Sequence, residues 1–185
     1  MAERKSALTD EVRAMIGKTA EKVEASLWGI EREDLRRFTQ AIMDPDPRYW
    51  DDAFAKTTKF GGIVTPPIYC TYLSRKAPPG VDDPITRAFL ANPNSDASVG
   101  VMEGGREQLP KIPTDLKRSL NAGNEIEVFK YPTLGDHIYS QSRYANITER
   151  FGKDGSPMLI VTTETVYTDQ NGVKLCVIRQ SGILR

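Results

Sequence analysis

The sequence predicts an α+β domain in which an antiparallel sheet wraps around one buried helix. The N-terminal part shows helical periodicity, and the C-terminal part is rich in β-branched residues separated by short turns. Between them, residues 68–73 are apolar on nearly every side, which predicts a buried helix. A chain of 185 residues can bury one substantial core, so we expect one domain over residues 1–185.

Three helical segments are expected before the buried helix, the first within an N-terminal helix and lead-in over residues 1–29. It is short, its apolar face is formed by Leu8, Val12, Met15 and Ile16, and either Thr9 or Asp10 can cap it. The second covers residues 31–43, with acidic residues in its first turn, where the helix dipole favours them. A third short segment is expected at residues 51–56.

Pro45 and Pro47 predict a rigid, non-helical loop that carries Asp44 and Asp46, because proline restrains its own backbone and that of the residue before it. The buried helix should open further on, with Thr65 as its N-cap and a proline in its first turn. Residues 77–113 then form a long Gly- and Pro-rich insertion, with a short helix expected at residues 84–90.

Four strands are expected after the insertion, at residues 124–131, 136–151, 158–168 and 173–184. Turn residues separate them at 133–135, 153–155 and 170–172. The last two separators contain Asp-Gly and Asn-Gly, which predict antiparallel hairpins.

The composition argues against several classes of function. Twenty-five basic residues balance twenty-five acidic ones, so no net field attracts nucleic acid or an anionic membrane. We find neither a signal-peptide core nor an apolar run of ~20 residues, and expect a soluble cytoplasmic protein. Cys70 and Cys176 lie in apolar segments, which indicates buried thiols. One histidine and two separated cysteines do not provide an ordinary zinc site, so we expect no metal.

Residues 38–49 and 60–67 together resemble the hydratase motif of MaoC-like enoyl-CoA hydratases and dehydratases. The resemblance is to the N-terminal MaoC-like, or FAS1-like, dehydratase domain, and it spans residues 30–67 and 121–184. Its supporting signatures are Ala41-Ile-Met-Asp-Pro-Asp-Pro-Arg-Tyr-Trp-Asp51, Val64-Thr-Pro-Pro67, and Tyr131-Pro-Thr-Leu-Gly-Asp136 leading into Ser142-Arg143. The resemblance implies a single hotdog fold, and hotdog sheets commonly pair with one another.

In active members of this family, an aspartate and a histidine activate water for addition to an enoyl thioester, or catalyse the reverse reaction. The resemblance places that aspartate at Asp44, but the family's histidine is replaced by Tyr49 and its asparagine by Asp46. A tyrosine titrates near pH 10 and is a poor base at neutral pH. If Pro67 occupies the family's glycine position, one oxyanion donor is also missing, which can cost about 3 kcal/mol of transition-state stabilisation.

The resemblance therefore implies a subunit that binds an acyl-CoA thioester and pairs with a separate Asp/His-bearing hotdog chain. Candidate catalytic residues are Asp44, Asp46 and Tyr49, and candidate substrate-binding residues are Gly62, Thr65, Ile68, Tyr69 and Arg143. We expect no cofactor beyond the coenzyme A or acyl carrier of the substrate. Alternatives are a self-sufficient homodimeric hydratase using Asp44, a non-enzymatic acyl-CoA-binding module, and a thioesterase. A purely structural alternative is that Asp44 and Asp46 form Asx turns.

Overall fold

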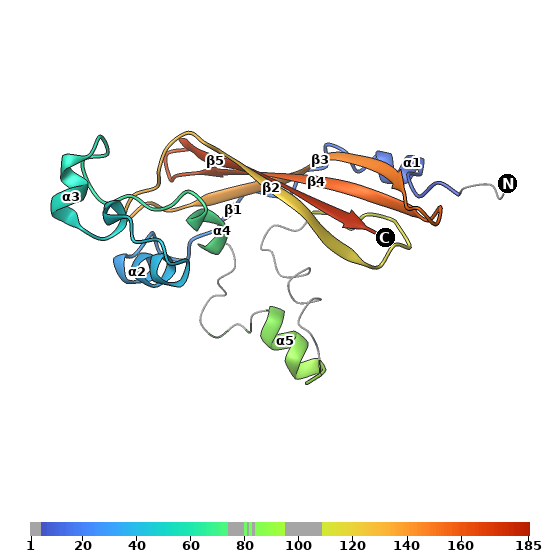
Figure 1. Cartoon of the computed structure of the whole chain (residues 1–185), viewed down its shortest axis with the longest axis horizontal. Helices are drawn as coiled ribbons and strands as arrows, with labels where there is room; N and C mark the ends of the chain where they lie inside the picture. The colour runs from blue at the N-terminus through green and yellow to red at the C-terminus, as the bar shows by residue number, and fades with distance from the viewer. Residues whose placement is uncertain (1–4, 74–79, 81, 83, 95–108) are drawn as a thin grey trace.

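A computed structural model describes residues 5–73, 80, 82, 84–94 and 109–185. They form a five-stranded antiparallel sheet with strand order β1-β3-β4-β5-β2 (Figure 1). The strands are β1 (Val23–Glu24), β2 (Ser119–Val128), β3 (Tyr139–Phe151), β4 (Pro157–Thr168) and β5 (Lys174–Leu184). The helices are α1 (Asp10–Arg13), α2 (Arg32–Ala41), the 3-10 helix η1 (Pro47–Tyr49), α3 (Asp52–Thr57), α4 (Tyr69–Leu73) and α5 (Pro84–Ala91).

Both hairpins predicted from the turn residues are confirmed. Strand β3 pairs antiparallel with β4, and β4 pairs antiparallel with β5. Gly155 and Gly172 have φ values of 81° and 77°, a backbone conformation that glycine adopts without steric cost. The carboxylate of buried Asp169 accepts hydrogen bonds from the backbone of Asn171 and Val173, which fixes the second turn.

The predicted burial of α4 against the sheet is confirmed. Tyr69, Cys70 and Leu73 are at most 2% exposed, and they share one core cluster with residues of α2 and of the sheet. The buried sheet residues of this cluster are Tyr167, Leu175, Cys176 and Ile178, and Ile138 joins it from the position just before β3. Cys70 and Cys176 are both buried free thiols, as expected. The sheet therefore wraps around α4 in the α+β arrangement that the sequence predicts.

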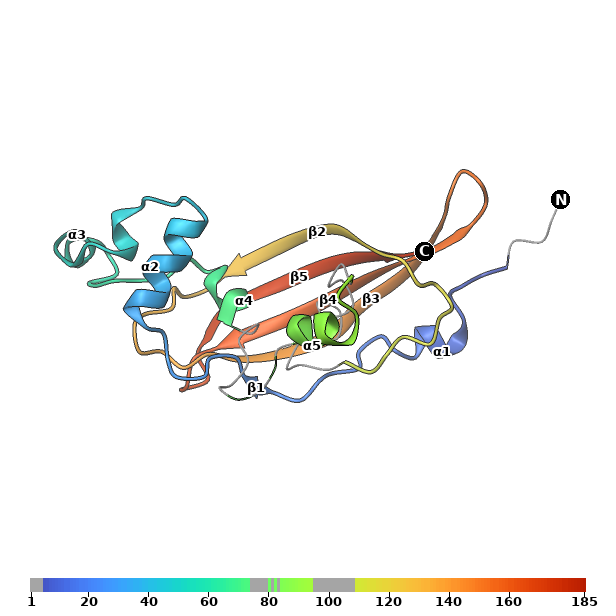
Figure 2. The same cartoon turned by 90° about the horizontal axis from the view of Figure 1, so that it is seen from below.

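A second core cluster covers the other end of the same sheet face (Figure 2). Leu159 and Val161 belong to this cluster and Tyr167 to the first; even spacings along β4 place all three side chains on one face. Helix α1 supplies Val12, while the chain just after it supplies Met15. The two ends of the sheet are thus stabilised by different parts of the N-terminal half.

The N-terminal lead-in is more ordered than the sequence indicates. Thr9 is the residue that caps α1, because its side chain accepts a hydrogen bond from Val12 N. The helix is a single turn, so the apolar pattern that extends to Ile16 overestimated its length. The chain then runs beside β3, and Val23 pairs with Ser140 in the short strand β1, which the sequence did not predict.

Two further boundaries differ from the prediction. The first long strand was expected at residues 124–131 but is Ser119–Val128. It starts earlier because Ser119 already pairs with Leu184, the last residue of β5. Helix α4 begins at Tyr69, so Thr65 does not cap it; two consecutive prolines disfavour helical angles before that point. The predicted helices at residues 31–43, 51–56 and 84–90 correspond to α2, α3 and α5.

About half of the predicted insertion at residues 77–113 lies outside the described residues, which include only 80, 82, 84–94 and 109–113 of this segment. At its end, Ile112 is 9% exposed and packs in the second core cluster. No helix within the described ranges has the length and apolar character needed to cross a membrane.

Candidate functional site

The loop after α2 is held against the helix end by backbone and side-chain hydrogen bonds. Thr39 is 4% exposed, and its hydroxyl donates to the carbonyl of Leu35. Met43 adopts a φ of 55°, and Asp44 N then donates to the carbonyl of Thr39 at 3.0 Å. These contacts turn the chain sharply and place Asp44 at the start of the loop.

The carboxylates of Asp44 and Asp46 each accept a hydrogen bond from the backbone N–H of the residue two positions later in the chain. Asp44 Oδ1 accepts from Asp46 N at 3.1 Å, and Asp46 Oδ1 accepts from Arg48 N at 2.9 Å. These are Asx turns, the geometry that the purely structural alternative anticipates. The loop is not helical at Asp44 and Asp46, as its two prolines predict, and η1 begins directly after Asp46.

Asp46 is also paired with Arg48, which sequence reasoning did not single out. Arg48 Nε donates to Asp46 Oδ2 at 2.8 Å, and only about a quarter of the Asp46 side chain is exposed. The hydrogen bonds from Arg48 hold the pKa of Asp46 below its ordinary value, and Asp46 in turn raises the pKa of Arg48. Asp46 therefore stays ionised at neutral pH and is a poor proton donor.

Replacing Arg48 with methionine should raise the pKa of Asp46 towards that of an ordinary aspartate, because the largest cause of its depression is removed. Carbon-detected NMR titration of the Asp46 carboxyl group measures this directly. The variant Arg37→Met serves as the control, since Arg37 is exposed and pairs with Glu33. An unchanged Asp46 titration in Arg48→Met would show that the pair does not control this carboxylate.

Tyr49 faces the interior beside this ion pair. Tyr49 is 7% exposed, and burial raises the pKa of its hydroxyl, although the nearby Arg48 opposes this effect. The Arg48 guanidinium lies 5.6 Å from the Tyr49 ring centroid and 5.9 Å from that of Phe60. The Phe60 ring in turn packs against Tyr131 at 4.9 Å. At neutral pH, a tyrosine in this setting is therefore deprotonated to a smaller extent than an exposed one.

The segment before α4 runs beside the loop and the start of the sheet. Val64 N donates to the carbonyl of Arg48 at 3.3 Å, and Thr65 N donates to that of Pro132 at 2.8 Å. The Thr65 hydroxyl is fully buried and has no hydrogen-bond partner among the described residues. After the two prolines, Ile68 is the first residue with a backbone N–H, and its side chain is 42% exposed.

The remaining candidate residues fall into different surroundings. Tyr69 is fully buried, its ring meets Phe38 edge-on at 5.0 Å, and its hydroxyl has no partner among the described residues. Burial raises the pKa of this hydroxyl. Gly62 is partly exposed, with open space on the side where a Cβ would lie.

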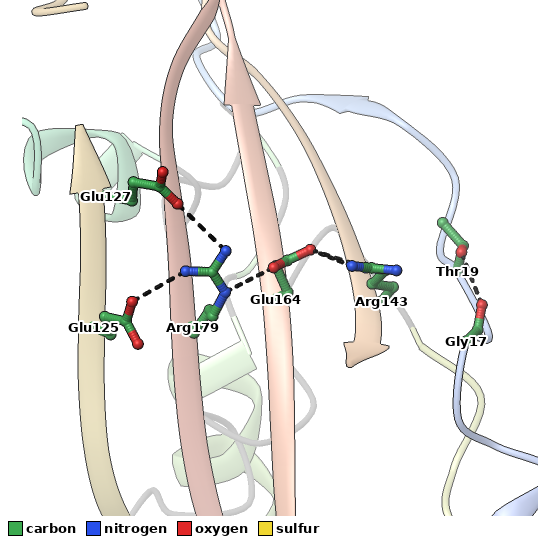
Figure 3. Close-up of polar contacts among 7 residues, drawn as sticks. All are labelled: Gly17, Thr19, Glu125, Glu127, Arg143, Glu164 and Arg179. Carbon is green, nitrogen blue, oxygen red and sulfur yellow. Dashed lines mark hydrogen bonds and ion pairs between the residues drawn. The ribbon is translucent and has the colours of Figure 1, made fainter. Parts of the chain in front are cut away.

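Arg143 lies on the opposite face of the sheet from α4. Its neighbour Ser142 points to the α4 face and contacts Thr165 there, so Arg143 points outward. Its guanidinium binds Glu164 at 2.7 Å, as Figure 3 shows. The structure thus brings Asp44, Asp46 and Tyr49 together but places Arg143 away from them.

His137, the only histidine of the chain, lies two residues before β3, and its Nδ1 is 2.6 Å from Glu24 Oε1. It is thus engaged at the β1 end of the sheet. Across the described ranges, no group of three or more His, Cys, Asp or Glu side chains is arranged to hold a metal ion.

A family model described as the FAS1-like dehydratase domain region matches residues 14–177. That match covers most of the chain, including the loop, strands β2, β3 and β4, and the first residues of β5. The chain belongs to the FAS1-like dehydratase family. The family explains why the residues around the Asp44 loop resemble a hydratase motif. No curated protein matches the chain.

Solved structures show the fold of this FAS1-like dehydratase domain. A chain of the ChsH1-ChsH2 complex from Mycobacterium tuberculosis is 14% identical, with 95% of this chain and 89% of that chain covered and a TM-score of 0.66. A MaoC-like dehydratase from Rhodospirillum rubrum is 16% identical, with coverages of 90% and 88% and a TM-score of 0.55. The predicted hotdog fold is confirmed.

A third similar structure is a chain of the HadBC complex, a 3R-hydroxyacyl-ACP dehydratase from Mycobacterium tuberculosis. It is 14% identical, with 91% of this chain and 96% of that chain covered and a TM-score of 0.57. At these identities the likeness concerns the fold. The roles assigned to Asp44, Asp46 and Tyr49 in the FAS1-like dehydratase domain therefore stay predictions that rest on the loop itself.

Proposed function

We propose that this chain is the substrate-binding subunit of a hydratase or dehydratase acting on enoyl or 3-hydroxyacyl thioesters of coenzyme A or an acyl carrier. It pairs with a second hotdog chain, which supplies the aspartate and histidine that activate water. The observation that carries this proposal is the state of the Asp44 loop. Asp46 is kept ionised by Arg48, and Tyr49 is buried with a raised pKa. Neither side chain is suited to transferring a proton at neutral pH.

The entry to α4 supports a binding role better than an independent catalytic one. Pro66 and Pro67 have no N–H to offer a thioester oxygen, and Tyr69 N already donates to the carbonyl of Pro66. Ile68 N–H is the remaining donor at this turn, and it would contact the thioester carbonyl. A single donor gives less stabilisation than a pair.

The exposed edge of the sheet supports the pairing with a second hotdog chain. All ten residues of β2 are exposed, including three apolar side chains at or above 40% exposure: Leu120, Ile126 and Val128. A long open edge with apolar residues is a site for pairing with another strand. Two of the similar structures, ChsH1-ChsH2 and HadBC, are themselves complexes of two different chains.

The test compares the purified chain alone with the chain co-expressed with a hotdog subunit that carries the sequence Gly-Asp-x-Asn-Pro-x-His. Hydration of crotonyl-CoA and of longer enoyl-CoA substrates is followed by loss of the enoyl thioester absorbance. We expect no turnover by the chain alone and turnover by the pair, abolished when the partner's motif histidine is replaced. Hydration at ordinary enzyme rates by the isolated chain would overturn the proposal.

The variant Asp44→Asn separates the proposal from a self-sufficient homodimer. In a homodimer that uses Asp44 as its acid/base group, the substitution should abolish turnover, a loss of at least about a hundredfold. In the two-chain enzyme, the partner performs the proton transfers, so the variant should keep most of the turnover of the pair. Circular dichroism and urea unfolding of Asp44→Asn provide the folding control.

A further inference from the structure

The edge strand β2 has two chemically different faces. Ile126 and Val128 lie opposite Ile178 and Cys176 on the α4 side, so this face is apolar. The alternate residues, Glu125 and Glu127, point to the outer face of the sheet. In the described part of the chain β2 pairs with β5 alone, so its other edge is free to accept a strand (Figures 1 and 2).

A row of charged side chains crosses the outer face and ends at this edge (Figure 3). Glu164 is bound by Arg143 at 2.7 Å and by Arg179 at 2.8 Å. Arg179 also reaches Glu125 at 3.1 Å and Glu127 at 3.4 Å. Three carboxylates thus share two guanidiniums, and the negative excess lies on β2. The side chains of Glu125 and Glu127 are 69% and 50% exposed, against 12% for Glu164.

Pairing of β2 with its own copy does not satisfy these side chains. If two copies pair antiparallel about a two-fold axis at Ile126, Ile126 meets itself, but Val128 lies opposite Asn124 and Glu125 lies opposite Glu127 of the copy. Like charges directly opposite one another destabilise a strand pair. If the whole strand pairs with itself, Ile126 meets Asn121 and Glu127 meets Leu120. Apolar residues then face polar ones on both sides of the sheet.

A third register, centred on Ala122, would bring Lys117 opposite Glu127. It would also place the irregular step between Asn121 and Gly123 at the centre of both strands. A bulge disrupts the regular hydrogen-bond ladder at that point. None of the three self-pairings therefore combines matched charge, matched apolar residues and a regular ladder.

We propose that the free edge of β2 docks the edge strand of a different hotdog subunit. That strand presents basic residues opposite Glu125 and Glu127 and apolar residues opposite Ile126 and Val128. The inference rests on the proposed function for the existence of a second subunit. It adds the chemistry that selects that subunit over a second copy of this chain, since the same carboxylates attract the partner and repel the copy.

The edge can be tested without knowing the natural partner, by mixing the wild-type chain with the charge-reversed variant E125K/E127K. In the register centred on Ile126, the mixture brings Glu opposite Lys at both positions. We expect the mixed dimer, measured by native mass spectrometry and sedimentation, to be at least about tenfold tighter than either self-association. Added salt should weaken it. A mixture no tighter than the wild type alone would overturn the proposal.

A second variant, E125Q/E127Q, removes the repulsion without placing lysines beside Arg179. Its self-association should be tighter than that of the wild type, with greater hydrogen-exchange protection of β2 amides. Weaker self-association would mean that these carboxylates attract a second copy, and it would overturn the proposal. The control E11Q/E33Q changes net charge equally at exposed positions outside β2 and should associate as the wild type does.

The outcome is separable from that of the hydration assay, because the mixing experiment uses no substrate. Turnover by the two-chain enzyme together with no effect of charge reversal would remove the edge inference and leave the proposed function. Charge-selective pairing without any turnover would remove the proposed function and leave the edge inference.

Discussion

Replacing Leu35 with alanine should lower the free energy of unfolding by about 3–4 kcal/mol and the Tm by about 10 °C. Leu35 is fully buried on α2, in the core cluster that α2 shares with α4 and the sheet. Truncation leaves a cavity whose lining cannot collapse freely, because the neighbours are fixed by the sheet ladder. Urea unfolding at several temperatures and differential scanning calorimetry measure the loss.

The variant Leu90→Ala is the matched control for this prediction. It is the same substitution on another helix, α5, at a residue that is 71% exposed. Its cost should be below about 0.5 kcal/mol, because little apolar area is lost from the interior. Equal losses in the two variants would contradict the assignment of Leu35 to the core that positions the Asp44 loop.

Replacing Glu164 with glutamine should destabilise the protein by about 1.5–3 kcal/mol at pH 7. The Glu164 side chain is 12% exposed, and its two oxygens accept from Arg143 and Arg179. Glutamine keeps the shape but loses the charge, so both guanidiniums lose a charged acceptor. Both are partly exposed, and solvent compensates for part of the loss. Chemical unfolding at pH 7 gives the value.

The difference between wild type and Glu164→Gln should shrink as the pH falls. Burial alone would raise the pKa of Glu164, but the hydrogen bonds from the two arginines outweigh it and hold the pKa below its ordinary value. The folded state therefore binds fewer protons than the unfolded state, whose glutamate pKa is about 4.3. The stabilisation is full well above pH 4.3 and is lost as the pH falls through the folded pKa. Unfolding at pH 7, 5 and 4 tests this dependence.

Glu33→Gln is the control for the role of burial. Glu33 also pairs with two arginines, Arg36 and Arg37, but its side chain is 59% exposed. Surface pairs of this kind contribute little to stability. A loss in Glu33→Gln equal to that in Glu164→Gln would show that burial between β3 and β5 adds nothing to the pair.

Most of the secondary structure could be predicted because its causes are local in the sequence. Asp-Gly and Asn-Gly turns produced the two hairpins, and the apolar spacing of residues 31–43 produced α2. Strand β1 was missed because two residues carry no periodic signal and become a strand only by pairing with Ser140 and Tyr139. The start of β2 was missed for the same reason, since its bounds depend on β5.

The candidate site likewise combines features with causes local in the sequence and features that depend on distant segments. The prolines predicted a rigid loop at Asp44, and the hydrogen bonds around it fit that expectation. The pairing of Asp46 with Arg48 spans only two residues and could have been proposed from the sequence. Burial of Tyr49, and the contact of Phe60 with Tyr131, depend on segments distant in sequence.

By itself, the sequence determined the fold class, the family and the loop in which tyrosine replaces the family's histidine. The tertiary structure decided which charges meet. Glu125, Arg143, Glu164 and Arg179 lie on four strands and form one row only after antiparallel pairing sets their register. Register is a property of whole strands, whereas turns and prolines act on their neighbours. The acidic edge of β2 therefore becomes visible only in the assembled sheet.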